Sequence, residues 1–91
     1  MRVQTLDENL ARYFKLSKTE GVIVTDVASG SPAEKAGFKE GDVIIEVNGE
    51  PIKDDQSLIE LIQIAKVGDV LNFKVIRDGK EITLKMKLEK S

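Results

Sequence analysis

The side chains that most often perform catalysis or bind metal ions are scarce in this chain. Its 91 residues include no His and no Cys, so neither a Ser-His-Asp nor a Cys-His mechanism can be assembled from it. Asp54 and Asp55 are adjacent, which suits helix capping better than chelation of a metal ion. Glu46 and Asp26 stand in no recognisable catalytic spacing. We therefore expect no catalytic residue, no bound metal and no cofactor.

The composition also excludes several classes of partner. Lys and Arg number 14 and Asp and Glu number 16, and the resulting net charge of -2 gives no general attraction to nucleic acid. No apolar run approaches the ~20 residues that span a bilayer, so we expect no direct membrane insertion. Polar residues within the first four positions indicate that the chain carries no targeting signal. The 41% of hydrophobic residues, mostly aliphatic, favour one compact, β-rich core.

The most informative segment spans residues 30–44, which combine signals for a short helix, a turn and a buried strand. Ser31 is a helix-capping residue, and Pro32 suits the first helical position. Glu34 follows Ser31 by three residues and completes a capping box. Gly37 is typical of the left-handed residue that ends a helix.

Hydrophobic periodicity and turn residues predict the elements that must position any functional side chain. Helices are predicted over residues 7–16 and about 56–66, besides the short helix after Ser31. The predicted strands cover residues 1–6, 22–27, 43–47, 50–52, 70–76 and 81–88. In the strand before the last, Leu71, Phe73 and Val75 share a face that we expect to be buried.

This ordered set of signals resembles the PDZ domain family, and in particular the bacterial PDZ domains attached to HtrA-type (Deg-type) serine proteases. The resemblance covers nearly the whole chain. It rests most strongly on Gly30-Ser31-Pro32-Ala33, Ala36-Gly37, Gly41-Asp42-Val43-Ile44 and Val47-Asn48-Gly49. It implies an α+β fold, a PDZ-like, partly open antiparallel β-barrel or sandwich of five or six strands capped by two helices.

The resemblance also implies a function, namely noncatalytic binding of extended or C-terminal hydrophobic peptides by β-strand addition. The peptide would lie between the first strand and the long helix. The helix carries two apolar stripes, and we assign Leu58, Ile62 and Ala65 to the core. The residues expected to bind peptide are Met1, Arg2, Val3, Gln4, Ser57, Leu61 and Ile64.

These groove residues would have different roles. Met1, Val3, Leu61 and Ile64 would wall a pocket for an apolar terminal side chain. Arg2 and Gln4 would mainly contribute backbone groups to the added strand, and Ser57 would contact the ligand's third-from-last residue.

The chain departs from the family pattern at its beginning. The hydrophobic-Gly-hydrophobic loop that holds the peptide carboxylate in PDZ domains has no counterpart ahead of Arg2. We therefore expect residues 1–91 to be a single PDZ domain of a larger protease, with its carboxylate-binding loop missing or truncated. Recognition of the carboxylate should be weakened, since hydrogen bonds to a charged group contribute ~1.5–3 kcal/mol each.

The parent protein would be a serine endopeptidase of the periplasm or cell envelope that acts in protein quality control. Its domain would capture polypeptide segments with apolar ends, or relay their binding to the rest of the protease. Two alternatives remain open: a module that holds protease subunits together, and a PDZ domain of another membrane-associated protease or a secretion component. A small enzyme is a further alternative, which an isolated-domain protease assay without turnover would exclude.

Overall fold

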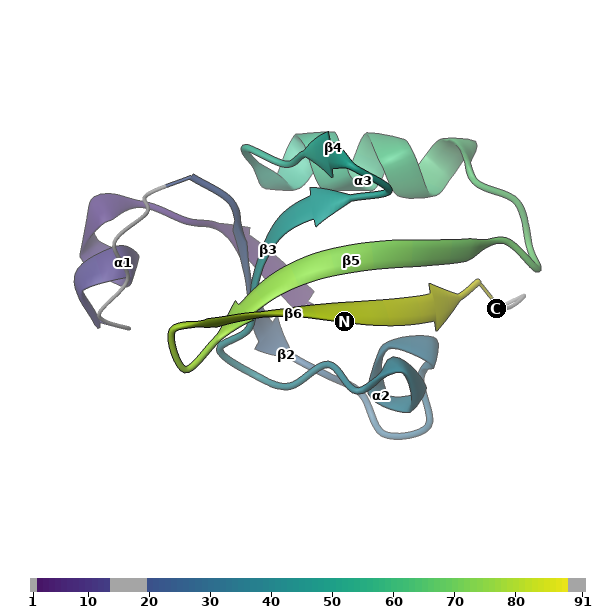
Figure 1. Cartoon of the computed structure of the whole chain (residues 1–91), viewed down its shortest axis with the longest axis horizontal. Helices are drawn as coiled ribbons and strands as arrows, with labels where there is room; N and C mark the ends of the chain where they lie inside the picture. Colours follow the sequence, from purple (N-terminus) through teal and green to yellow (C-terminus); the bar gives the residue numbers. More distant parts are fainter. Residues whose placement is uncertain (1, 14–19, 89–91) are drawn as a thin grey trace.

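The computed structural model describes residues 2–13 and 20–88, which form one antiparallel sheet of six strands and three helices (Figure 1). In chain order the elements are β1 (Arg2–Thr5), α1 (Glu8–Tyr13), β2 (Val22–Asp26), α2 (Pro32–Ala36), β3 (Val43–Val47), β4 (Glu50–Pro51), α3 (Asp55–Ile64), β5 (Val70–Arg77) and β6 (Lys80–Lys87). The fold class predicted from the sequence is confirmed. Besides the two capping helices α2 and α3, the structure contains α1, which the sequence predicted from residue 7 onward.

The order of the strands determines which of them are open to further pairing. Neighbouring strands follow the order β1-β2-β3-β5-β6, and β4 pairs with β3 off this path. In Figure 1, α3 and α2 lie on opposite sides of the curved sheet. Because α2 contacts β6, a helix accompanies the β6 edge, while β1 forms the other edge.

Two tight turns fix the register of the hairpins. Asn48 and Gly49 both have positive φ, 51° and 83°, and so do Asp78 and Gly79, at 51° and 76°. Positive φ at both central residues defines the turn type whose twist matches that of paired strands, and Asn-Gly and Asp-Gly are the sequences that adopt it most readily. The β5–β6 hairpin consequently pairs along its whole length.

The predicted capping box at α2 is present in a modified form. The Ser31 hydroxyl accepts a hydrogen bond from the Glu34 N–H at 3.2 Å. The Glu34 carboxylate accepts one from the N–H of Gly30, one residue before the cap, at 2.9 Å. Gly37 ends the helix in the left-handed conformation with φ 101°, as its position in the sequence predicted.

The core lies between the helices and the inner face of the sheet. Leu71, Phe73 and Val75 are each at most 4% exposed, so the predicted buried face is confirmed. The rings of Phe38 and Phe73 meet edge to face with centroids 5.0 Å apart, a favourable aromatic geometry. Leu58 of α3 is 1% exposed in the same cluster, and it anchors the helix on the sheet.

Some element boundaries differ from the sequence prediction. α3 ends at Ile64, two residues before the predicted end at Lys66, because Ala65 is extended with φ −78° and ψ 154°. The Asp7 carboxylate accepts the Leu10 N–H at 2.8 Å and caps α1. The predicted end of this helix, and Met1 at the start of the first strand, lie outside the described residues.

A buried carboxylate ties two distant segments together. Asp42 is 1% exposed and accepts hydrogen bonds from Arg77 Nε at 2.8 Å and Nη2 at 2.6 Å, and from the Lys39 N–H at 2.9 Å. Arg77 Nη2 also donates to the Gly37 carbonyl at 2.7 Å. The hydrogen bond to Asp42 raises the pKa of Arg77 above its ordinary value, and burial opposes this rise. The pair thus joins β5 to the loop between α2 and β3.

We expect Asp42→Asn to lower the free energy of unfolding by about 3 kcal/mol, because it leaves the partly buried Arg77 guanidinium without its counter-charge. Urea unfolding monitored by circular dichroism measures this loss. Lys74→Met is the matched control, since Lys74 pairs with Glu46 at 3.3 Å and Glu81 at 3.1 Å on the surface, where ion pairs contribute little. Equal losses in the two variants would contradict the prediction.

The start of α3 carries a second carboxylate with a structural role. Asp54 accepts hydrogen bonds from the Ser57 N–H at 2.8 Å and the Ser57 hydroxyl at 2.9 Å. Both bonds hold the pKa of Asp54 below its ordinary value of 3.8, and the bond from the Ser57 N–H has the larger effect. Of the two adjacent aspartates, Asp54 is therefore the helix cap.

The cap makes stability depend on pH with a defined sign. Because folding lowers the pKa of Asp54, its contribution is complete above the ordinary value of 3.8 and is lost as the pH falls through the folded pKa. Asp54→Asn retains a side chain that can cap the helix but removes the carboxyl group that titrates. We expect its urea midpoint to change less than the wild-type midpoint on acidification below about pH 4. Parallel pH profiles for the two proteins would count against this role.

Candidate functional site

The outer edge of β1 is the part of the sheet that is open to an additional strand. β1 pairs with β2 on one side, and no strand among the described residues pairs with its other side. Arg2 and Gln4 are exposed, whereas Val3 and Thr5 are half-buried. A strand edge without a partner presents N–H and C=O groups that another chain can pair with. The edge can therefore accept a short extended peptide.

A pair of hydrogen bonds fastens the beginning of α3 to the end of this edge strand. The Thr5 hydroxyl donates to Asp55 Oδ1 at 3.0 Å and accepts from the Asp55 N–H at 3.1 Å. These contacts join residues 50 positions apart in the chain. They place the first turn of α3 beside the last residue of β1, which closes one end of the space between strand and helix.

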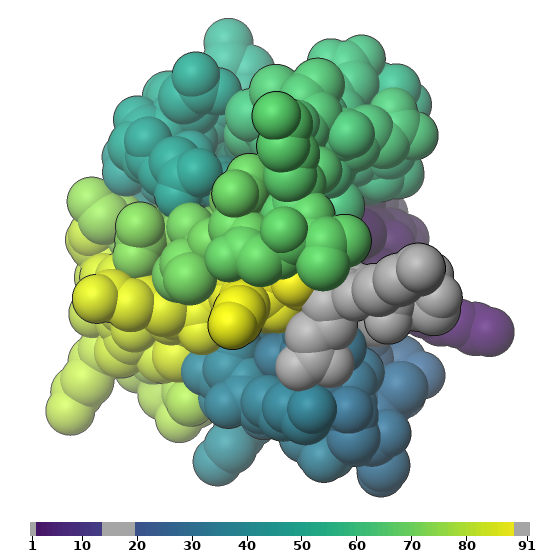
Figure 2. Space-filling view, turned by 90° about the vertical axis from the view of Figure 1, so that its right-hand side faces the viewer, coloured from purple at the N-terminus to yellow at the C-terminus, as the bar shows by residue number. Residues whose placement is uncertain are grey.

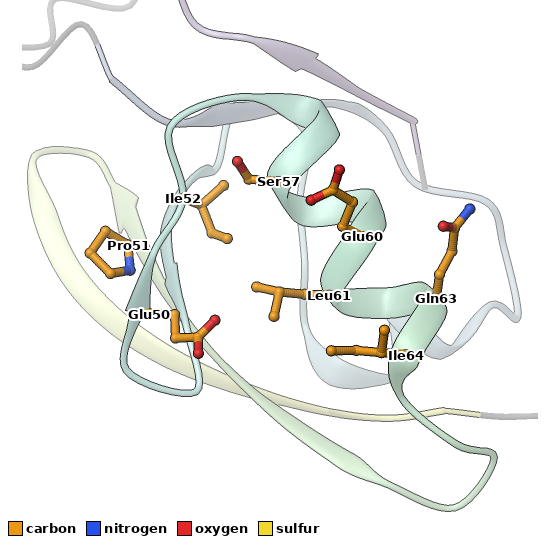
Figure 3. A pocket seen from close by; sticks show the side chains of 8 residues that line it. All are labelled: Glu50, Pro51, Ile52, Ser57, Glu60, Leu61, Gln63 and Ile64. Atoms are coloured by element: carbon orange, nitrogen blue, oxygen red, sulfur yellow. The ribbon is translucent and has the colours of Figure 1, made fainter.

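The flank of α3 that faces β1 follows from this contact. Ile59 lies four residues after Asp55 and Ile62 seven, so the three share one stripe of the helix. Ile59 is 41% exposed, while Ile62 and Val3 both pack against the main core. In Figure 3 the labelled Gln63 side chain points away from the flank that carries Leu61 and Ile64. Helical spacing therefore puts Ile59 and Ile62 on the stripe of α3 that begins at Asp55, the residue in contact with the end of β1.

The helix residues predicted from the sequence lie on the other flank. Ser57, Leu61 and Ile64 line a cleft together with Glu50 and Pro51 of β4 (Figure 3). No residue of β1 lines this cleft. The structure therefore groups Arg2, Val3 and Gln4 on β1, and Ser57, Leu61 and Ile64 on α3, but it does not bring the two groups to one site.

The difference comes from the direction in which the helix is turned. Each residue of an α-helix advances by about 100°, so positions 57 and 59 lie on nearly opposite flanks. The assignment of Leu58, Ile62 and Ala65 to the core agrees with the structure, since Leu58 is buried and the other two pack against the core. Ile59, an apolar residue outside both predicted stripes, is the sequence signal that would have identified the β1 flank.

No group of three or more His, Cys, Asp or Glu within residues 2–13 and 20–88 is arranged to hold a metal ion. None of the helices in these ranges is long and apolar enough to cross a membrane. Among the described residues the site consists of a strand edge open to pairing beside the first turn of a helix.

Comparison with known proteins identifies relatives that are much longer than this chain. The DegP-like periplasmic serine endoprotease of Chlamydia trachomatis is 40% identical over 82 residues, which is 90% of this chain and 16% of the relative. The serine protease Do-like HtrA of Bacillus subtilis is 41% identical over 87 residues, 94% of this chain and 19% of that protein. The chain thus spans less than a fifth of the length of these curated relatives.

Solved structures and a family profile agree with these relatives. The HtrA3 PDZ domain bound to the phage-derived ligand FGRWV superimposes with a TM-score of 0.84 and 26% identity, covering 96% of this chain and 79% of that one. The HtrA-type protease AlgW with a decapeptide gives a TM-score of 0.88 and 25% identity, covering 97% of this chain and 27% of that one. The profile of the PDZ domain matches residues 2–88. The chain therefore belongs to the PDZ domain family and is of the type found in HtrA and DegP-like serine proteases.

Proposed function

We propose that this domain binds extended or C-terminal peptides with apolar ends by adding them as a strand to the outer edge of β1. The single observation that carries the proposal is that this edge pairs with no described strand on its outer side and lies beside the first turn of α3. Backbone groups of Arg2, Val3 and Gln4 would form the ladder. Ile59 and Ile62 would form the apolar wall. Met1, which the sequence analysis predicted as a groove residue, is retained in this proposal.

The direction of the bound peptide follows from the two ends of the groove. The Thr5–Asp55 contact closes the end beside the last residue of β1, and a carboxylate lies there. The exposed Arg2 side chain lies at the other end. A peptide that runs antiparallel to β1 would place its own carboxylate near the Arg2 guanidinium and its preceding residues toward Thr5. Charge complementarity therefore favours this antiparallel orientation.

The relatives support the same class of ligand. The HtrA3 PDZ domain was crystallised with the peptide FGRWV, which ends in an apolar residue, and AlgW with a decapeptide. In the parent protein the domain would capture misfolded segments or regulate a serine endopeptidase. The names of the bacterial relatives include periplasmic proteases, so we propose a periplasmic or cell-envelope location for the parent.

The position of the groove can be tested with Ile59→Ser and the free-acid peptide FGRWV. Full burial of an exposed Ile side chain contributes about 1.5–3 kcal/mol, and Ile59 has 41% of its surface left to bury, so we expect about three- to eightfold weaker binding in the variant. Ile59 is 41% exposed in the free domain, so the substitution should leave the fold intact. Amide chemical-shift titration measures both the affinity and the residues affected, which should be those of β1 and residues 55–63.

Ile64→Ser is the matched control, because Ile64 is an exposed isoleucine on the opposite flank of the same helix. Its affinity for FGRWV should equal that of the wild-type domain. If Ile64→Ser weakened binding and Ile59→Ser did not, the peptide would lie on the β4 flank and the proposed groove would be wrong. If no shift saturated in the wild-type domain, the function itself would have to be abandoned for this peptide class.

The role of Arg2 can be tested with a pair of peptides, FGRWV with a free carboxylate and the same peptide with a C-terminal amide. Exposed charge pairs contribute about 0.2–1 kcal/mol, so Arg2→Gln should weaken binding of the free acid about two- to fivefold. The variant's affinity for the amidated peptide should equal that of the wild-type domain, since this peptide has no terminal carboxylate to pair with Arg2. Equal effects on both peptides would argue against the antiparallel orientation.

A further inference from the structure

The second flank of α3 forms a cleft of its own. A space of about 540 Å³ lies between α3 and β4, and the two elements are neighbours in both Figure 1 and Figure 2. The volume falls in the range of about 300–1,000 Å³ that is common for ligand sites. Its lining comes from β4, the residue after it and the helix: Glu50, Pro51, Ile52, Ser57, Glu60, Leu61, Gln63 and Ile64. Because β1 contributes nothing to it, the cleft is separate from the proposed peptide groove.

The inner surface of this cleft is apolar and its mouth is open. Ile52 is 3% exposed and Leu61 is half-buried against the core, whereas Ile64 at the mouth is 77% exposed. A side chain inserted between them would cover the exposed isoleucine and remove apolar surface from water. Pro51 has no backbone N–H, so the β4 margin is poorly suited to strand addition. Recognition here would therefore depend on side chains.

Two carboxylates determine what kind of side chain fits. Glu50 belongs to β4 and Glu60 to α3, so the cleft carries one acidic residue on each wall (Figure 3). None of the eight lining residues is basic. Within the described part of the chain neither carboxylate forms an ion pair, and Glu60 accepts only a long hydrogen bond of 3.3 Å from the Gln56 amide. A ligand with cationic groups on both sides of an apolar anchor would satisfy both walls.

We propose that the cleft between α3 and β4 binds a polypeptide segment in which a bulky apolar side chain is flanked by Lys or Arg. The apolar residue occupies the space between Ile52, Leu61 and Ile64, and the basic residues face Glu50 and Glu60. This is a second binding surface, which does not depend on the β1 groove. A nucleic acid would be repelled by the two carboxylates, and an uncharged apolar molecule would leave both of them without partners.

The test uses a seven-residue peptide, KLKFRLK, with an acetylated N-terminus and an amidated C-terminus. Blocking the ends removes the free carboxylate that the β1 groove is proposed to favour. A second peptide, ELEFELE, keeps the apolar residues and reverses the charge. Amide chemical-shift titration of the domain with the basic peptide should saturate, with shifts in residues 50, 52 and 57–64 and none in residues 2–5. The acidic peptide should bind at least tenfold more weakly.

Three variants separate the contributions of charge, apolar contact and position. The double variant Glu50→Gln, Glu60→Gln should weaken binding of the basic peptide about fivefold. Ile64→Ser should weaken it by a similar factor through lost apolar contact. Ile59→Ser and Glu40→Gln should have no effect, since Ile59 lies on the β1 flank and Glu40 is an exposed acidic residue in another part of the structure. All these residues are partly or fully exposed, so the variants should fold.

Each other outcome overturns the proposal. Shifts in residues 2–5 would mean that the basic peptide enters the β1 groove instead. Equal binding of the acidic peptide would exclude recognition by Glu50 and Glu60. Concentration-dependent sedimentation that Ile64→Ser abolishes would mean that the cleft contacts a second copy of the chain. Binding of FGRWV is measured in parallel on the same samples, so a failure of the cleft proposal is distinguishable from a failure of the groove.

Discussion

Burial of one apolar stripe of α3 determines where both candidate binding surfaces lie. Leu58 is almost fully buried, and Ile62 and Ala65 pack beside it against the core. A helix that is buried along a single stripe keeps both of its flanks open. One flank stands beside the free edge of β1, and the other faces β4. The domain thus presents two chemically different surfaces that are separated by the width of one helix.

The two edge strands of the sheet differ in how readily they could pair with another chain. β6 carries exposed lysines at positions 80, 85 and 87 and contacts α2, features that discourage pairing with another chain. β1 is only four residues long, and the contact between Thr5 and Asp55 closes one of its ends. An edge that is short and closed at one end limits uncontrolled association while remaining open to a few residues of peptide. This contrast between the edges is the structural basis for assigning the groove to β1.

Polar contacts between distant segments hold this arrangement together. The Thr5–Asp55 contact fixes a helix to a strand 50 residues away, and the Asp42–Arg77 pair fixes the end of β5 to the loop after α2 across 35 residues. Each of these contacts consists of more than one hydrogen bond between the same two residues, so it requires a defined relative orientation of the two. Interactions of this kind favour one packing of the elements over alternatives of similar apolar burial. They stabilise the frame in which the groove and the cleft keep their shape.

The amino-acid sequence by itself determined the elements, their order, the capping box of α2, the hairpin turns and the buried face of β5. Each of these depends on residues close together in the chain: a hydroxyl three residues from a glutamate, an Asn-Gly pair, or apolar side chains in alternation. The sequence also indicated that the long helix has a core stripe containing Leu58. Only the tertiary structure decided which flank of that helix meets β1, and hence that Ile59 shares a stripe with Asp55, the residue that contacts β1, while Ser57, Leu61 and Ile64 face β4. That choice depends on the rotation of α3 about its axis, which is set by burial of Leu58 and by Thr5, a residue 50 positions from its partner. Local patterns carry no information on such a distant contact.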